Sequence, residues 1–259
     1  LAAAYVALSW LSYRHGDYGT GLAILEEALE VLPPDAAVAR SRVRCEIGWS
    51  LLRLRRRVES EAELRATLSV AEAEHDRLGV MRALDGLGCA EAAAGRIDVS
   101  VDHLERALSI AVELGDGLQE VITRIHLVTS LTAAGRFAVA RRHAVRTLEV
   151  GRLMGDRYIE SVAARQAAEL EDAAGSRAAA GDLRRRELRL LEELGGNPRN
   201  EAWAHAHLAV IARAAGDEAT VETESAAARR LAHRSPTPDD ADWIETALAA
   251  SRWADVPER

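Results

Sequence analysis

The feature that most constrains this chain is a regular spacing of helix-ending turns. Helical stretches rich in Ala and Leu end at six anchor positions, and neighbouring anchors lie 39 to 41 residues apart. The anchors are Gly16, Arg55, Gly95, Gly135, Gly175 and Gly216. Self-similarity at a constant period of this size is typical of a solenoid, in which each unit packs on its neighbours. Because solenoids present extended surfaces, the spacing favours a binding role over catalysis.

The amino-acid composition favours helices and excludes several kinds of catalytic and binding site. Hydrophobic residues make up 48% of the 259 residues, but aromatic residues only 4%, which favours closely packed helices over a sheet sandwich. All 33 basic residues are Arg, so a P-loop lysine and a Schiff-base lysine are excluded. The net charge of −8 argues against direct nucleic-acid contact, which requires basic residues to neutralise phosphates. We therefore expect an all-α protein without a P-loop and without direct nucleic-acid contact.

Each period divides into a helix A before the anchor and a helix B after it. Val101, Leu104, Leu108 and Ala111 follow one another at steps of three and four, which places them on one helix face as core. At Gly115-Asp116, Gly155-Asp156 and Gly216-Asp217, a glycine suits a left-handed helix end and the aspartate can cap the next helix. Gly196-Asn197-Pro198 offers the same with Asn as the cap and Pro at the first helical position.

Arg55 is the exception among the anchors. A left-handed conformation at a non-glycine residue costs about 1 kcal/mol. We therefore expect the second turn to differ in shape from the others.

The periods predict an array over residues 1–234 and a different C-terminal piece over 235–259. The expected repeats are 1–34, 35–78, 79–115, 116–155, 156–196 and 197–234. After the proline-containing break at 235–238, Thr237 and Asp240 have the spacing of a helix start, and the helix is expected to run to about Trp253. This last helix would cap the apolar end of the array, which makes thirteen helices in all.

The first period resembles a tetratricopeptide (TPR) repeat. The residues that carry the resemblance are Tyr5, Leu8, Gly16-Asp17-Tyr18, Gly21, Leu25, Ala28-Leu29 and Pro33, and later periods keep fewer of them. The resemblance implies a right-handed superhelical solenoid of about six helix pairs plus the capping helix. Since the period is 40 residues and not the roughly 34 of an ordinary TPR, the chain is similar to a long-helix subgroup. Such arrays resemble the sensory modules of bacterial LuxR-type and signal-transducing ATPase regulators.

The resemblance also implies a concave groove formed by the A helices. An Arg guanidinium can donate two hydrogen bonds to one carboxylate, and aromatic side chains supply rigid apolar area. A groove with both would suit an extended peptide that carries a carboxylate. The alternative is that the Trp residues fill gaps between helices and the Arg residues are solvated. The groove positions that the resemblance implies are Trp10, Tyr13, Arg42, Cys45, Trp49, Arg82, Asp85, Cys89, Arg165, Glu169, Trp203 and Arg213.

Other kinds of site have little support. The chain contains no His-Glu-x-x-His, no Gly-x-Ser-x-Gly and no dinucleotide-binding glycine pattern, so no metal, cofactor or catalytic centre is expected. Two cysteines are too few for a disulfide framework, and no stretch approaches the ~18 apolar residues of a membrane span. We expect a cytoplasmic module that binds a protein, a peptide or a small effector within a larger bacterial regulator. A constitutive scaffold is the alternative, and an enzyme is the least favoured class.

Overall fold

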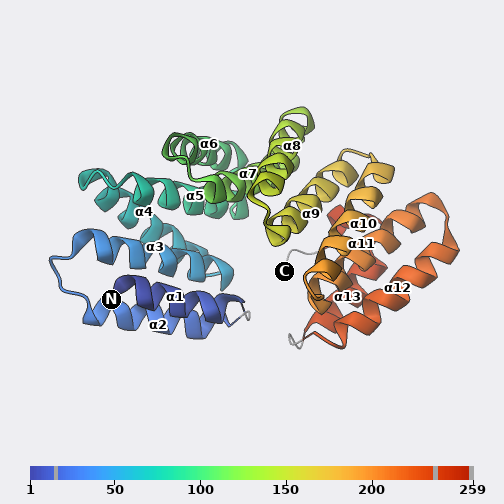
Figure 1. Cartoon of the computed structure of the whole chain (residues 1–259), viewed down its shortest axis with the longest axis horizontal. Coiled ribbons are helices and arrows are strands. Elements are labelled where there is room, and N and C mark those ends of the chain that lie inside the picture. The colour runs from blue at the N-terminus through green and yellow to red at the C-terminus, as the bar shows by residue number, and fades with distance from the viewer. Residues whose placement is uncertain (15–16, 236–238, 257–259) are drawn as a thin grey trace. The chain divides into compact units, whose positions relative to one another are not determined.

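The computed structural model describes residues 1–14, 17–235 and 239–256, and these residues are helical without any strand (Figure 1). Two compact units divide the chain, Leu1–Ser130 and Leu131–Arg259. The expected all-α fold is confirmed, and the described ranges contain the thirteen α-helices that the periods predict. The helices are α1 (Ala2–Arg14), α2 (Tyr18–Val31), α3 (Ala37–Arg53), α4 (Arg57–Ala73), α5 (Arg77–Ala93), α6 (Ile97–Leu114), α7 (Gly117–Ala133), α8 (Phe137–Met154), α9 (Arg157–Ala173), α10 (Arg177–Glu193), α11 (Pro198–Ala215), α12 (Glu218–Ala232) and α13 (Asp240–Ala249), with a 3-10 helix η1 (Trp253–Asp255).

Neighbouring helices pack in pairs within each unit. In the first unit α1 packs on α2, α3 on α4 and α5 on α6, while the A helices α1, α3 and α5 also contact one another in order. In the second unit α9 packs on α10 and α11 on α12. An A helix is therefore in contact with its own B helix and, in the first unit, with the A helix of the next repeat. This arrangement places side chains of successive A helices on one surface.

The close packing of the pairs depends on glycines that face leucines. The Leu64 side chain of α4 is fully buried, and a Cβ atom added at Gly48 of α3 would lie 2.7 Å from its Cγ. A Cβ added at Gly86 of α5 would lie 2.8 Å from Leu64 Cδ2. Leu104 of α6 fits against Gly88 of α5 in the same way, with 2.5 Å to its Cγ. Glycine is needed at these helix-interior positions because any larger residue would overlap the leucine.

The turn at Arg55 has the same shape as the glycine turns, so the expected difference is wrong. Arg55 has φ +58°, close to the +77° of Gly95. At both turns the N–H of the following residue donates to a carbonyl five positions back, from Arg56 to Leu51 and from Arg96 to Glu91, each at 2.9 Å. These helix-ending hydrogen bonds satisfy carbonyl groups that would otherwise lack partners, and they outweigh the cost of about 1 kcal/mol for a left-handed arginine.

The predicted caps are confirmed where the structure describes them. The Asp116 carboxylate accepts from the Gln119 N–H at 3.0 Å, Asp156 from Ile159 at 3.1 Å and Asp217 from Thr220 at 3.1 Å. Asn197 accepts from the Asn200 N–H, and Pro198 occupies the first turn of α11. Gly16 lies outside the described residues.

Three arginine ion pairs between neighbouring repeats of the first unit have a similar spacing. Arg42 bonds to Asp76, Arg82 to Glu46, and Arg96 to Glu61, and these partners are 34 to 36 residues apart. Ion pairs therefore join neighbouring repeats of the first unit, and Asp85 pairs with His126 at a larger separation of 41 residues.

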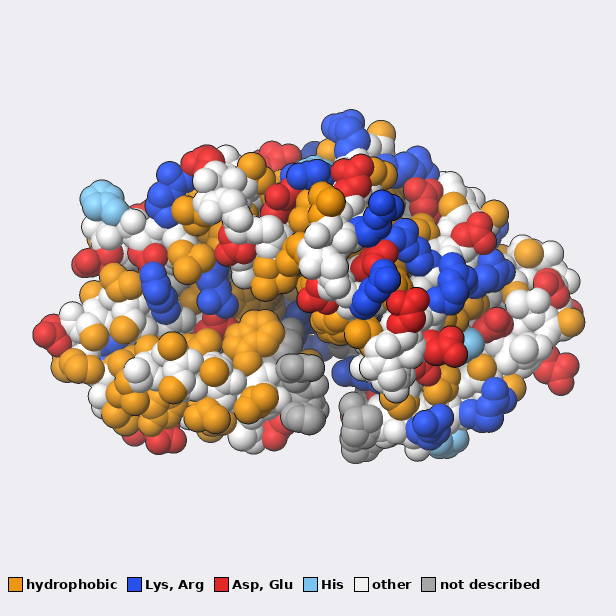
Figure 2. Space-filling view, viewed as in Figure 1, with side chains coloured by type: hydrophobic (Ala, Val, Ile, Leu, Met, Phe, Trp, Pro, Cys, Tyr) orange, Lys and Arg blue, Asp and Glu red, His pale blue; other side chains and the backbone are white. Residues whose placement is uncertain are grey.

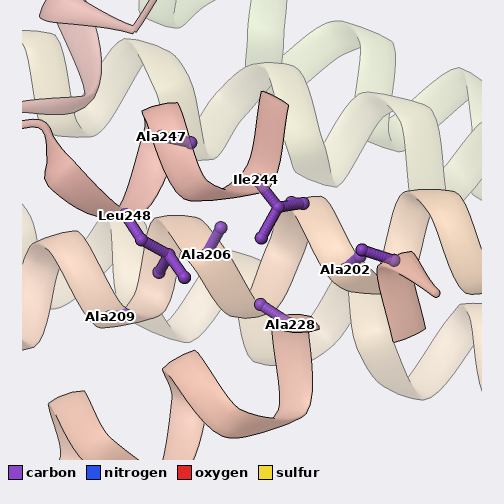
Figure 3. Packing of buried hydrophobic residues seen from close by; sticks show 8 residues of the cluster. Ala202, Ala206, Ala209, Ala228, Ile244, Ala247 and Leu248 are labelled. Carbon is purple, nitrogen blue, oxygen red and sulfur yellow. The ribbon is translucent and has the colours of Figure 1, made fainter. Parts of the chain in front are cut away.

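The C-terminal helix covers the end of the second unit, as a capping helix should. Figure 3 shows Ile244 and Leu248 of α13 directed toward Ala206 of α11, and Ala228 of α12 belongs to the same buried cluster. The predicted end of this helix is wrong, because α13 ends at Ala249. Thr237, proposed as its start, lies outside the described residues.

The first helix is apolar on nearly every side. Leu8 and Leu11 of α1 are exposed, and Figure 2 shows hydrophobic side chains gathered over the N-terminal helices.

Within the described ranges, every helix is too short or too polar to cross a bilayer.

Candidate functional site

Five of the predicted groove residues lie on the A helices of the first unit, and their side chains take part in two clusters and one separate ion pair. They are Trp10 of α1, Arg42 and Trp49 of α3, and Arg82 and Asp85 of α5. We call these five residues the helix-A surface of the first unit. A small hollow in this surface is lined by Arg42, Cys45, Leu78, Gly79 and Arg82.

Glu46 of α3 connects three of the A helices. Its carboxylate is nearly buried and accepts a hydrogen bond from Arg82 of α5. The indole N–H of Trp10 on α1 donates to the same carboxylate. Burial raises the pKa of Glu46, while Arg82 and Trp10 act in the opposite direction by stabilising its charged form. A paired buried carboxylate fixes the position of both neighbours, so Trp10 and Arg82 are held rigidly on the surface.

Arg42 forms a two-pronged ion pair with Asp76, the residue before α5. Its Nε lies 3.1 Å from Oδ2 and its Nη2 lies 3.0 Å from Oδ1. The hydrogen bond from Arg42 is the largest of the effects that hold the pKa of Asp76 below its ordinary value. The Arg42 side chain is 49% exposed, so solvent reaches the guanidinium. A carboxylate from outside could therefore approach the face of the fork that Asp76 does not cover.

Asp85, His126 and Trp49 form a second cluster, farther along the same surface. His126 Nδ1 of α7 lies 3.0 Å from Asp85 Oδ1, and its ring lies 5.6 Å from the Trp49 ring, tilted by 31°. Burial disfavours the imidazolium, but the Asp85 carboxylate and Cys89 outweigh it, and the pKa of His126 lies well above its ordinary value. Asp85 and Cys89 thus favour the protonated form of an imidazole that lies beside the Trp49 ring.

The two cysteines predicted on this surface do not form a reactive pair. Cys45 is buried, and burial raises the pKa of its thiol to about 12, so it stays protonated and inert. Cys89 is half-buried and contributes to the surroundings of His126. Among the residues that the structure describes, no three His, Cys, Asp or Glu side chains are placed to hold a metal ion.

The predicted residues of the second unit have internal partners. Glu169 of α9 accepts from the buried Arg184 of α10 at 3.0 Å. Trp203 of α11 stacks on Trp243 of α13 with ring centroids 4.6 Å apart. Arg213 of α11 donates to the Leu248 carbonyl at 2.7 Å. Arg165 of α9 is half-buried and lies near Glu187. Burial raises the pKa of Glu187, and Arg184 and Arg165 act in the opposite direction.

The structure thus brings five predicted site residues together and adds three that the sequence reasoning missed. Arg165 belongs to the other unit, and the side chain of Tyr13 lies outside the described residues. The missed residues are Glu46, Asp76 and His126. The available signal was spacing, since Glu46 and Asp76 lie 36 and 34 residues from their arginine partners and His126 lies 41 residues after Asp85.

Comparisons with known proteins identify the fold. No protein-family model and no curated protein matches the chain. A signal transduction ATPase with numerous domains and a TPR sensor, from Pyrococcus horikoshii, matches 96% of this chain at 15% identity with a TM-score of 0.73. This chain spans only 38% of that protein. A Rap protein complexed with competence and sporulation factor matches 95% of this chain and 79% of its own length, at 13% identity and a TM-score of 0.69.

A third structure is NprR in complex with its cognate peptide NprX. It matches 94% of this chain and 68% of its own length at 12% identity, with a TM-score of 0.65. At such identities the likeness establishes the architecture, which is an all-α TPR-like solenoid.

Proposed function

We propose that this TPR-like solenoid is a peptide- or protein-binding module that recognises its partner through the helix-A surface of the first unit. The observation that carries the proposal is a pair of side-chain clusters on the A helices, Trp10–Glu46–Arg82 and Asp85–His126–Trp49. The first cluster joins α1, α3 and α5, and the second joins α3, α5 and α7. The side chains are held by neighbouring repeats before a partner arrives, which lowers the entropy lost on binding.

The chemistry of the surface indicates an extended segment with an apolar residue and a carboxylate. Trp10 is 46% exposed and offers rigid apolar area, while the half-exposed fork of Arg42 offers two donors. Because Arg42 is already paired with Asp76, an incoming carboxylate must compete with or join that pair. A weakly bound acidic segment would therefore not be retained. A specific sequence would be favoured over any acidic chain for this reason.

The solved structures support the same class of role. Two of them are complexes with a peptide or signalling factor, and the third carries a TPR sensor within a multidomain ATPase. We propose that this chain likewise serves as the sensing or assembly module of a larger bacterial cytoplasmic regulator. Ligand binding would control that regulator only if the ligand prefers one arrangement of the repeats.

The test uses a phage-displayed library of random dodecapeptides as the probe. Peptides selected on the intact chain are titrated calorimetrically against the intact chain, Arg42→Ala and Arg106→Ala. Arg106 is a matched control because it is an exposed arginine on α6, with its nearest acidic oxygen, on Glu72, at 3.9 Å. We expect Arg42→Ala to weaken binding at least about 10-fold, equivalent to ~1.4 kcal/mol, and Arg106→Ala to leave it unchanged.

Equal loss in both arginine variants would show a non-specific charge effect and contradict the proposed site. The scaffold alternative is separated by capturing partners from a cytoplasmic extract before and after removal of small molecules. A partner retained equally in both conditions indicates a scaffold, whereas a partner gained or lost with the metabolite fraction indicates a sensor.

A further inference from the structure

The C-terminal residues after α13 lie on the A helices of the second unit. The 3-10 helix η1 contacts both α9 and α11. These are the helices that carry the predicted groove positions Arg165, Glu169, Trp203 and Arg213. In the second unit, the surface that corresponds to the proposed binding surface of the first unit is therefore occupied by the chain's own segment.

The occupant is anchored by one aromatic side chain. The Trp253 ring stacks on the His207 ring of α11, with centroids 4.3 Å apart and an interplanar angle of 17°. The Arg184 guanidinium of α10 lies 5.6 Å from the centroid of the Trp253 ring. The edge of Trp243 from α13 completes the surroundings at 5.9 Å. The His207 imidazole, the Arg184 guanidinium and the Trp243 ring together form a surface that suits an indole ring, and we call this surface the seat of Trp253.

The seat is held in place by groups that do not depend on Trp253. Arg184 is fully buried, and its Nε donates to His207 Nδ1 at 2.7 Å. Its Nη1 lies 2.7 Å from Glu187 and its Nη2 lies 3.0 Å from Glu169. His207 Nε2 lies 3.2 Å from Asp172 Oδ2 and is its donor, because Nδ1 accepts from Arg184. The buried arginine and the His207 ring therefore keep their positions when the indole leaves.

A second contact recognises the backbone. Arg213 Nη1 donates to the Leu248 carbonyl at 2.7 Å and to the Ala250 carbonyl at 3.2 Å. The backbone at Ala250 has φ −68° and ψ 143°, and at Arg252 φ −139° and ψ 147°, so the chain is extended where it leaves α13. Arg213 thus bonds to one carbonyl of the last turn of α13 and to one carbonyl of the segment that follows it. A backbone contact followed by an anchored aromatic ring is a way to bind a peptide.

We propose that Arg213, His207 and Arg184 form a binding site for a peptide segment with a tryptophan anchor. Residues 250–256 of this chain, which are extended at Ala250 and Arg252 and form η1 from Trp253, are its resident, exchangeable occupant. The charged side chains of the segment, Arg252 and Asp255, bond to each other at 2.7 and 3.1 Å. The Trp253 and Val256 side chains, which pack against the buried cluster of α11 to α13, and the Ala250 carbonyl therefore carry the attachment. The proposal extends the proposed function to the second unit, and it is independent of the first unit because none of those residues takes part.

Tethering explains how the resident segment keeps the site closed. A segment linked by a few residues has an effective local concentration of about 1 mM, so a free peptide at micromolar concentration competes poorly. A partner with a tighter aromatic-anchored segment, or one that engages the first unit as well, would displace it. Displacement would release the C-terminal residues at the same time as the partner binds.

The experiment measures binding of a fluorescein-labelled peptide with the sequence of residues 249–256 to the full-length chain by fluorescence anisotropy. Trp253→Ala empties the seat, and Arg252→Ala is the matched control because its side chain is 68% exposed and leaves Trp253 in place. We expect the peptide to bind Trp253→Ala at least about 10-fold more tightly than it binds the intact chain or Arg252→Ala. The same peptide with Ala in place of its tryptophan should not bind.

The Trp253→Phe variant is a control for loss of folding, because a phenyl ring preserves part of the stacking on His207. The peptide should bind this variant with intermediate affinity. Equal peptide binding to Trp253→Ala and to the intact chain would overturn the proposal, because residues 250–256 would then not occupy the site. Absence of binding to both Trp253 variants at about 1 mM peptide, with native helix content by circular dichroism, would also overturn it.

Discussion

Leu64 is the position at which the packing account can be tested most sharply. It is fully buried in α4 and fits between two helices that present glycine to it, Gly48 on α3 and Gly86 on α5. Leu64→Ala should lower the free energy of unfolding by about 4 kcal/mol, near the upper end of the range for buried leucines. The reason is that Gly48 and Gly86, which face the cavity, have no side chains that could move into it.

The decisive comparison is Gly48→Ala in two backgrounds. In the intact chain the added Cβ would lie 2.7 Å from Leu64 Cγ and 2.9 Å from Cδ2, so we expect a loss of roughly 1–3 kcal/mol. In the Leu64→Ala background the overlap disappears. The alanine should then stabilise the chain by about 1 kcal/mol, because it favours the helix more than glycine does.

The assay is urea unfolding followed by far-ultraviolet circular dichroism, with all four chains of the double-mutant cycle measured together. Gly181→Ala is the matched control, because its nearest neighbour, Arg185 Nη1, is at an ordinary contact distance of 3.5 Å. It should stabilise the chain in either background. The reasoning is refuted if Gly48→Ala changes stability with the same sign and size whether or not Leu64 is present.

Three further predictions concern backbone strain and pH. Arg55→Gly should raise the free energy of unfolding by up to about 1 kcal/mol in urea denaturation, because φ is +58° at this residue. Gly95→Ala should lower it by about 1 kcal/mol through backbone strain alone, since φ is +77° and no atom lies within 4 Å of the added Cβ. Burial and Arg184 lower the pKa of His207 to about 4, so between about pH 6.5 and 4 the unfolded chain binds a proton that the folded chain does not. Stability should therefore fall by about 2 kcal/mol from pH 7 to pH 5, a loss that His207→Gln should lack when both chains are unfolded at the two pH values.

The sequence predicts the fold well because the fold follows from local signals that recur. The spacing of the anchors, the apolar steps and the Gly-Asp pairs each describe one repeat, and the structure repeats that unit. Arg55 was misjudged because its side-chain type was weighed without the hydrogen bonds that close the turn. The end of α13 was misjudged because Trp253 stacks on His207, a tertiary contact that helix propensity does not contain.

The candidate site was predictable in part. The A-helix positions followed from the family resemblance, which specifies which face of a helix is presented. The partners Glu46 and His126 could not be assigned, because pairing across repeats depends on how far one repeat is shifted along the next. The separation is 36 residues for Arg82 and Glu46 but 41 for Asp85 and His126, and it becomes known only when the helices are packed.

Nuclear magnetic resonance of the tryptophan indole N–H groups tests the central claim most directly. The indole signals are assigned by single substitutions, and a library-selected peptide is added to the intact chain. The proposed function predicts saturable shifts at Trp10 and Trp49 of the first unit and none at Trp203. Unshifted Trp10 and Trp49 signals in a chain that binds the peptide would contradict it.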